Sequence, residues 1–243
     1  MRRILVPLLL AAALPSLAWS AATDLCRAQS RATRTPVVEL YTSEGCSSCP
    51  PADRWLSGLK DAAASGQVVA EAFHVSYWDS LGWVDRFAAP AYNARQREIA
   101  ARAGAANVYT PQLVRDGRAA RDYGPALVSA PEPAGAVIRL QRQDGEAIAQ
   151  VTPTAPGAHW SAYWTVTEHG HASKVRAGEN AGEFLQHDFV VRELVPAGTY
   201  DGPHQLALRP PAPTPGHPQQ LNLVVFDPAT GRPLQALSLS CSG

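Results

Sequence analysis

The sequence predicts two successive domains, an α/β domain followed by an all-β domain of the sandwich type. Up to about residue 130, short β-branched and aromatic runs alternate with stretches of helical periodicity, which is typical of α/β layers. Beyond that point, about eight short strand-like runs follow one another, separated by turns that contain Gly, Pro or Asp. Most prolines and histidines also fall in the second part, so the composition changes where the pattern changes.

The first domain combines two kinds of local pattern. Two runs are rich in β-branched and aromatic residues, as buried strands are, and two longer stretches have helical periodicity, the first of them carrying Trp55, Leu56 and Leu59 on one face. A last short strand runs into Asp116-Gly117, a dipeptide typical of hairpin turns. The expected order is strand 37–41, helix 52–60, strand 68–76, helix 89–103 and strand 112–115.

The second domain shows strand signals without helical stretches. Turn dipeptides such as Asp144-Gly145 and Asp201-Gly202 separate its runs, and we expect the proline-rich segment 210–218 to be a loop. The strand-like runs are 136–140, 147–151, 160–167, 173–176, 188–194, 205–208, 221–227 and 234–239.

The N-terminus has the layout of a secretory signal peptide. Arg2 and Arg3 precede an apolar run over 4–17, and small residues follow around Ser20. The run is about 14 residues long, short of the roughly 20 that span a membrane. The alternative to a cleaved signal peptide is an uncleaved membrane anchor. We therefore expect a periplasmic or secreted protein with no membrane span after cleavage. The expected division is residues 1–22 for the signal peptide, 23–130 for the first domain and 131–243 for the second.

The charge balance excludes some classes of protein. The 21 basic and 21 acidic side chains give a formal net charge of zero, so there is no basic surplus to neutralise a nucleic acid backbone. Hydrophobic residues make up 46% of the chain and charged residues 17%, which suits a packed core and excludes a mainly disordered protein. We expect no nucleic acid partner.

Export places the four cysteines in an oxidising compartment, where they can pair. Cys26 and Cys241 lie near opposite ends of the chain, whereas Cys46 and Cys49 form a C-x-x-C motif. We expect these to be the two disulfides, the first acting as a clasp between the ends of the protein.

The C-x-x-C motif follows a predicted strand and precedes a predicted helix. At a helix start, the helix dipole and the unpaired N–H groups stabilise a thiolate, the form of cysteine that attacks disulfides. This context favours a redox pair. Zinc or Cu(I) binding is one alternative, because metal sites use the same spacing with further ligands. An inert structural disulfide in a non-catalytic interaction protein is the other.

A second informative element is the dipeptide Thr110-Pro111 at the start of strand 112–115. An X-Pro bond is the main place where a cis peptide is tolerated. A cis bond here would turn the chain sharply and leave the neighbouring backbone free to pair with an extended peptide. The alternative is a trans proline that opens an edge strand.

Four segments carry a resemblance to known proteins: VELYTSEGCSSCPPAD at 38–53, FHVSYWD at 73–79, LGW at 81–83 and VYTPQ at 108–112. Together they resemble a family of secreted bacterial thioredoxin-like proteins of uncharacterised function. The resemblance covers about residues 36–118 and continues weakly through 175–180 and 187–192.

The resemblance implies thiol–disulfide exchange. Cys46 would be the attacking thiol, Cys49 the resolving thiol, and Pro111 a cis proline facing them, with Thr110 presenting its backbone to the substrate. The partners would be thiol- or disulfide-containing exported proteins and a membrane electron donor, and no cofactor is implied. We expect the sulfur of Cys46 to be exposed at the helix tip. Because Pro50 and Pro51 follow Cys49, the helix should begin at one of these prolines.

Three further residues are candidates for supporting roles. Glu39 is flanked by apolar strand residues, and a buried carboxylate there could relay the proton of the resolving cysteine; the alternative is a surface ion pair. His74 is a candidate proton shuttle or copper ligand, or else a hydrogen-bonded core residue. Trp78 belongs to an aromatic cluster that either packs a core or shields the dithiol.

Overall fold

The computed structural model describes residues 26–124 and 131–241. The expected signal peptide, residues 1–22, lies outside this part of the chain. Within the described residues, no helix has the length and apolar character that crossing a membrane requires.

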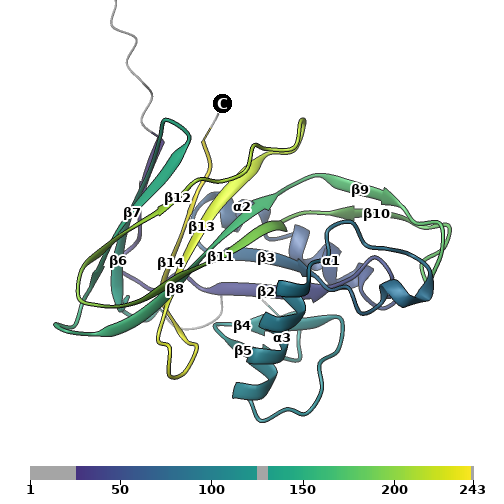
Figure 1. Ribbon diagram of the computed structural model, residues 1–243, viewed down its shortest axis with the longest axis horizontal. Coiled ribbons are helices and arrows are strands. Elements are labelled where there is room, and N and C mark those ends of the chain that lie inside the picture. The colour runs from purple at the N-terminus through teal and green to yellow at the C-terminus, as the bar shows by residue number, and fades with distance from the viewer. Residues whose placement is uncertain (1–25, 125–130, 242–243) are drawn as a thin grey trace, which may run out of the picture.

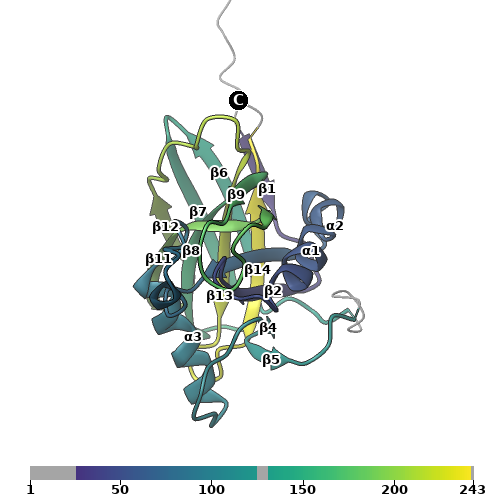
Figure 2. The same cartoon turned by 90° about the vertical axis from the view of Figure 1, so that its right-hand side faces the viewer.

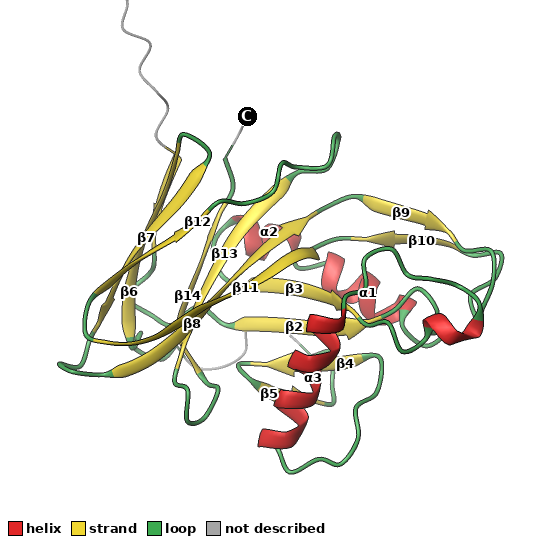
Figure 3. Cartoon of the chain, in the orientation of Figure 1, coloured by secondary structure: helices red, strands yellow, loops and turns green. Residues whose placement is uncertain are grey.

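Strands are the main secondary structure of the described chain, and they are arranged in three sheets (Figures 1 and 3). The largest is an eight-stranded sheet with the order β14-β13-β8-β11-β3-β2-β4-β5. Its strands, in that order, span Pro233–Leu239, Gln219–Phe226, His159–Glu168, Val190–Asp201, Val69–His74, Val37–Thr42, Gln112–Arg115 and Arg118–Ala120. The four-stranded sheet consists of β1 (Cys26–Gln29), β6 (Ala136–Gln143), β7 (Glu146–Pro153) and β12 (His204–Leu208). The two-stranded sheet pairs β9 (His171–Lys174) with β10 (Phe184–His187).

Helices cover both faces of the β3-β2-β4 part of the large sheet. Figure 2 shows α1 (Pro50–Ser57) and α2 (Lys60–Ala64) on one side and α3 (Pro90–Arg102) on the other. The only other helical turn among the described residues is the short 3-10 helix Asp79–Leu81. β2 runs parallel to β3 and antiparallel to β4, so the sheet is mixed. Alternate β2 residues face the two helical layers: Val38 and Leu40 pack towards α1, and Tyr41 packs towards α3.

The elements expected before residue 130 are present, with helix 52–60 divided into α1 and α2. The sheet, however, does not end where the composition changes. β11 pairs in parallel with β3 through Val190 and Ala72, and antiparallel with β8, so strands from both sides of residue 130 form one sheet. In addition, β1 at the N-terminal end pairs with β6. The residue ranges of the two domains therefore stay a prediction from composition.

The sandwich expected after residue 130 is formed by two facing sheets. β1, β6, β7 and β12 pack against the β8, β13 and β14 end of the large sheet, around one apolar core. Trp160, Trp164 and Ile138 are among its fully buried side chains. The sequence patterns did not indicate β1 or β10, because both are only four residues long and neither contains a β-branched residue.

A disulfide joins the two ends of the described chain. Cys26 and Cys241 are bonded, with 5.7 Å between their Cα atoms and 215 residues of sequence separation. The expected pairing is confirmed, and the bond links β1 to the segment that follows β14.

Candidate functional site

The second disulfide lies at the junction between β2 and α1. Cys46 and Cys49 are bonded with 5.4 Å between their Cα atoms. The helix begins at Pro50, as expected, and Cys49 is its N-cap. Contrary to the bias before proline, Cys49 has helical backbone angles (φ −77°, ψ −37°). The loop imposes this conformation, since the Cys49 amide donates to the Cys46 carbonyl at 3.2 Å and the Cys49 carbonyl accepts from the Ala52 amide at 2.9 Å.

The Thr110-Pro111 peptide bond is cis. It directly precedes β4, whose residue Gln112 is the register partner of Tyr41 in β2. Because β2 ends at Thr42 and runs on into the disulfide loop, the antiparallel pairing places the cis bond beside the start of that loop.

Trp78 connects the cis bond with the disulfide loop. Its indole N–H donates to the Thr110 hydroxyl at 2.7 Å. A Cβ added at Gly45 would lie only 3.0 Å from the Trp78 Cβ, so glycine permits this close approach. The half-buried Trp78 thus packs between the two loops.

The sulfur-bearing residues are more covered than the sequence predicts. Cys46 is 1% exposed and Cys49 is fully buried, whereas the intervening Ser47 and Ser48 are exposed. The expectation of an exposed Cys46 is therefore wrong for this oxidised form. A segment that is distant in the sequence packs against the disulfide loop and contributes to this burial.

That segment is the turn Gly178-Glu179-Asn180 between β9 and β10, which we call the strap. The Asn180 side-chain amide donates to the carbonyls of Glu44 and Cys46, both at 2.9 Å. One Glu179 carboxylate oxygen accepts from the Ser47 amide at 3.0 Å and from the Ser47 hydroxyl at 2.8 Å. The strap therefore holds the backbone of the disulfide loop at three residues, Glu44, Cys46 and Ser47.

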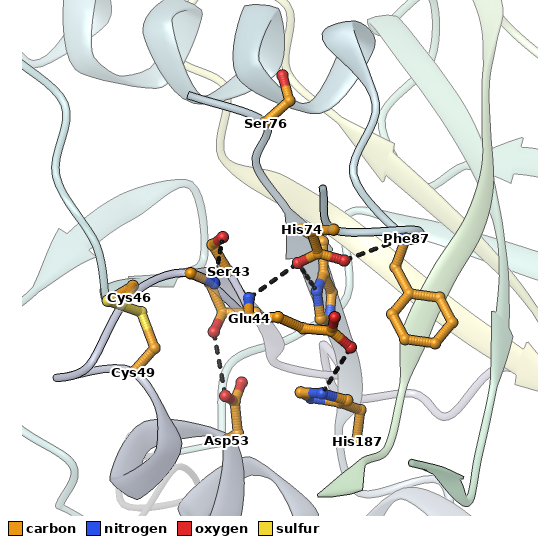
Figure 4. A network of polar contacts seen from close by, with 12 residues as sticks. Ser43, Glu44, Cys46, Cys49, Asp53, His74, Ser76, Phe87 and His187 are labelled. Carbon is orange, nitrogen blue, oxygen red and sulfur yellow. Dashed lines mark hydrogen bonds and ion pairs between the residues drawn. A yellow bond between two sulfur atoms is a disulfide. The ribbon is translucent and has the colours of Figure 1, made fainter. Parts of the chain in front are cut away.

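A network of buried polar side chains lies beside the disulfide (Figure 4). His74 Nδ1 contacts Asp85 Oδ2 at 2.7 Å, and the same oxygen accepts from the Glu44 amide at 2.9 Å. Glu44 Oε1 lies 3.4 Å from Nε2 of His187, which is on β10. Trp83 donates to the other Glu44 oxygen at 2.7 Å. One connected cluster thus contains side chains from four segments: β3, β10, the disulfide loop and residues 79–87.

The electrostatics of this network favour a charged His74. Burial alone would lower the pKa of His74, but Asp85, with help from Asp53 and Glu44, raises it above the usual histidine value. Burial likewise works to raise the pKa of Asp85, yet His74 and backbone amides hold it below the usual value. Both shifts agree with a buried ion pair. His74 is therefore a core residue held by Asp85, which matches one of the two readings from sequence.

Asp53 is a further buried acid near the disulfide, and it lies one helical turn after Cys49 on α1. Its carboxylate accepts from the Thr42 hydroxyl at 3.1 Å. Burial raises its pKa above the usual value, although His187 and His74 oppose that shift. In Figure 4, Asp53 stands between the disulfide and His187. A carboxyl group of this kind can hold or accept a proton near neutral pH more readily than an exposed one.

Glu39 lies elsewhere. It shares a sheet face with Tyr41, towards α3, and its carboxylate makes two contacts of 2.8 Å with Arg95 of that helix. The Tyr41 hydroxyl also donates to it at 2.8 Å. Thr42, which contacts Asp53, follows on the opposite face of β2. The structure thus places Glu39 in an ion pair on the far side of the sheet from α1.

The described residues contain no group of three or more His, Cys, Asp or Glu side chains arranged to hold a metal ion. His74 in particular directs Nδ1 to Asp85.

The family comparison covers both the disulfide and the strap. The family model described as "Protein of unknown function (DUF1223)" matches residues 37–226. The chain belongs to this family. The matched stretch runs from the first residue of β2 to the last residue of β13, and it bears out the expectation that the family is one of uncharacterised function.

Two solved structures are similar to the chain. The crystal structure of protein AGR_C_4864 from Agrobacterium tumefaciens is 21% identical, with a TM-score of 0.65, over 86% of this chain and 96% of that one. HBP35 of Porphyromonas gingivalis is 11% identical, with a TM-score of 0.54, over 87% of this chain and 76% of that one. At such identities the likeness shows a shared fold. No curated protein matches the chain.

Sequence reasoning missed several members of the site. Asp53 could have been found, because it stands four residues after Cys49 on a predicted helix and so shares its face. Glu44 and Asp85 offered no such signal, since they meet through a loop and an irregular segment. The strap residues and His187 lie in the segments 175–180 and 187–192, over which the family resemblance continues weakly. That signal did not place them at the site, because Glu179 is 132 residues from Ser47 in the sequence and the pairing of β9 with β10 brings it near.

Proposed function

We propose that this protein is an exported thiol–disulfide oxidoreductase with a thioredoxin-like arrangement, in which Cys46 and Cys49 are the redox pair. The observation that carries the proposal is the placement of a C-x-x-C disulfide at a strand-to-helix junction beside a cis Thr110-Pro111 bond. The parallel β2 and β3 strands, the antiparallel β4–β5 hairpin and the helices on both faces support the same fold.

The reaction would be a two-step exchange. In the direction that reduces a partner, the Cys46 thiolate attacks one sulfur of the partner's disulfide, forming a mixed disulfide and releasing the other sulfur as a thiolate. The Cys49 thiolate then attacks Cys46, which forms the Cys46–Cys49 disulfide and releases the partner's second thiolate. Two electrons pass from the dithiol to the partner disulfide, and protons balance the released thiolates. The opposite direction reverses each step.

Buried groups near the pair suit the handling of these protons. Cys49 must lose a proton before it can attack Cys46, and Asp53 lies one helical turn away in a site that raises its pKa. We assign Asp53 the role that sequence reasoning gave to Glu39, because Glu39 is committed to Arg95 on the opposite face. The charged His74–Asp85 pair lies deeper and fixes the loop through the Glu44 amide.

The substrate class proposed is an exported protein with a thiol or disulfide. Thr110 and Pro111 are only partly buried, and Trp78 occupies the Thr110 hydroxyl, so the backbone of this bend is the part left to meet an extended segment. A membrane electron donor would return the pair to its working redox state.

The test uses a defined partner. Reduced Cys49→Ser protein is mixed with an excess of a synthetic peptide disulfide, and the products are analysed by mass spectrometry after acid quenching. We expect one peptide to be attached at Cys46, and no adduct when Cys46→Ser is combined with Cys49→Ser. Failure of Cys46 to form the adduct while the protein remains folded would reject the proposal.

A further inference from the structure

The strap places a carboxylate against the residue that follows the reactive cysteine. Glu179 is exposed, yet one of its oxygens bonds both the amide and the hydroxyl of Ser47. These two bonds lower the pKa of Glu179, so it is ionised at neutral pH. Among the described residues, no cationic side chain lies within ion-pair distance of it. The strap therefore carries an uncompensated negative charge beside Cys46.

This negative charge disfavours the thiolate form of Cys46, which sites of this kind usually stabilise. A thiolate at a helix start is stabilised by nearby N–H groups and by the helix dipole. Here a carboxylate uses the Ser47 amide as its own donor and repels a second negative charge close by. The strap also restricts access, because Asn180 fixes the carbonyls on both sides of Gly45 while Cys46 is 1% exposed.

Other charges around the pair have partners of their own. Glu44, in the disulfide loop, contacts His187 from β10 and Trp83. Asp53, from α1, is bonded to Thr42. Asp85 and His74, behind the loop, neutralise each other. Glu179 is thus the acidic group bonded to the Cys46–Ser47 segment and open to solvent at the same time.

We propose that Glu179 is a positioning residue that restrains the reactivity of Cys46, by holding the disulfide loop closed and by setting a negative charge beside the thiolate that forms there. The inference rests on the proposed redox function of the pair. Its consequence is that the pair reacts only when the strap is displaced or its charge is neutralised, which limits exchange with unsuitable thiols.

The experiment measures the pH dependence of alkylation of Cys46 by iodoacetamide in the fully reduced protein, with mass spectrometry assigning the label to its peptide. Glu179→Gln keeps an acceptor oxygen for Ser47 and removes the charge. Glu183→Gln is the matched control, because Glu183 is an exposed carboxylate in the same β9–β10 connection. Glu179→Ala removes both the charge and the acceptor.

We expect Glu179→Gln to shift the midpoint of the alkylation profile to lower pH by roughly half a unit to one unit, the order of effect that a unit charge beside a thiol near the protein surface has on the pKa of that thiol. Its reduction equilibrium with glutathione should move towards the dithiol form, and Glu183→Gln should match the wild type. Glu179→Ala should show the same shift and, in addition, faster alkylation of Cys46 than the wild type at every pH. An unchanged midpoint in Glu179→Gln would overturn the inference. Because iodoacetamide reports on the thiol alone, the result is independent of whether a protein substrate reacts.

Discussion

The indole N–H of Trp78 donates to the hydroxyl of Thr110 at 2.7 Å, and this one bond ties the cis-proline bend to the disulfide loop. Trp78 reaches both because Gly45 leaves room for its Cβ. The β2–β4 pairing sets the two loops side by side, and Trp78, which belongs to neither loop, adds a second link between them.

Removing this bond should affect the rate of disulfide exchange more than the stability of the fold. Trp78→Phe keeps an aromatic ring but loses the donor, so we expect the free energy of unfolding to fall by about 1 kcal/mol and the exchange rate with a peptide disulfide to fall several-fold. Urea unfolding and stopped-flow kinetics measure the two effects. Thr110→Val removes the same bond from the other side. A double-mutant cycle without coupling between the two changes would show that the contact contributes nothing.

Asp53→Asn should slow the step in which Cys49 displaces the partner. The amide cannot accept the Cys49 proton, so the mixed disulfide should persist at least about ten times longer than in the wild type. Rapid acid quenching followed by mass spectrometry measures its lifetime. Asp61→Asn, at an exposed site on α2, is the control. Equal lifetimes in the wild type and in Asp53→Asn would remove Asp53 from the mechanism.

Glu39 should prove structural. Arg95→Met leaves the buried Glu39 carboxylate without its partner, and we expect a loss of about 3–5 kcal/mol in the free energy of unfolding. Adding Glu39→Gln to this variant should restore part of the loss, because the unpaired charge is then absent. Denaturant unfolding of the single and double variants tests this. If Glu39→Gln alone lengthened the mixed disulfide as Asp53→Asn does, the assignment of the proton acceptor would be wrong.

The His74–Asp85 pair should give the stability a definite pH dependence. Since the folded pKa of His74 is raised, its contribution is complete below the unfolded value of about 6.5 and is lost as the pH rises through the folded pKa. Since the folded pKa of Asp85 is lowered, its contribution is present above about 3.8 and is lost as the pH falls through the folded pKa. The pair should therefore stabilise most between those limits.

Urea unfolding from pH 4 to pH 9 measures this contribution as the difference between the wild type and His74→Asn. The comparison between two proteins is needed because Glu71 adds a pH dependence of its own. Burial raises the pKa of Glu71 to about 7, so its contribution to the free energy of unfolding is also lost as the pH rises. His159→Asn is the control, since the His159–Asp201 contact is exposed. A wild type and a His74→Asn variant that differ by a constant amount at every pH would contradict the charged pair.

Much of the fold could be predicted from the sequence because its signals are local. Strand 112–115 coincides with β4, and the Asp116-Gly117 turn has the positive φ angles that a tight hairpin requires. Local patterns do not reveal pairing between distant strands. The parallel contact of Val190 with Ala72, which merges the two predicted regions into one sheet, joins positions more than 100 residues apart.

The same limit applies to the site. Cys46, Cys49, Pro111 and Thr110 could be named because they belong to short motifs, and the structure brings them to neighbouring loops. The burial of Cys46 could not be predicted from the sequence, because Asn180, which bonds to its carbonyl, comes from a distant part of the chain.

The most direct test of the redox proposal is the reduction potential of the Cys46–Cys49 pair, measured by equilibrating the protein in glutathione and dithiothreitol buffers and counting free thiols by mass spectrometry. An oxidoreductase should titrate as a two-electron couple between about −270 and −120 mV, with Cys26–Cys241 still oxidised over that range. A pair that stays oxidised below about −300 mV, as structural disulfides do, would contradict the account.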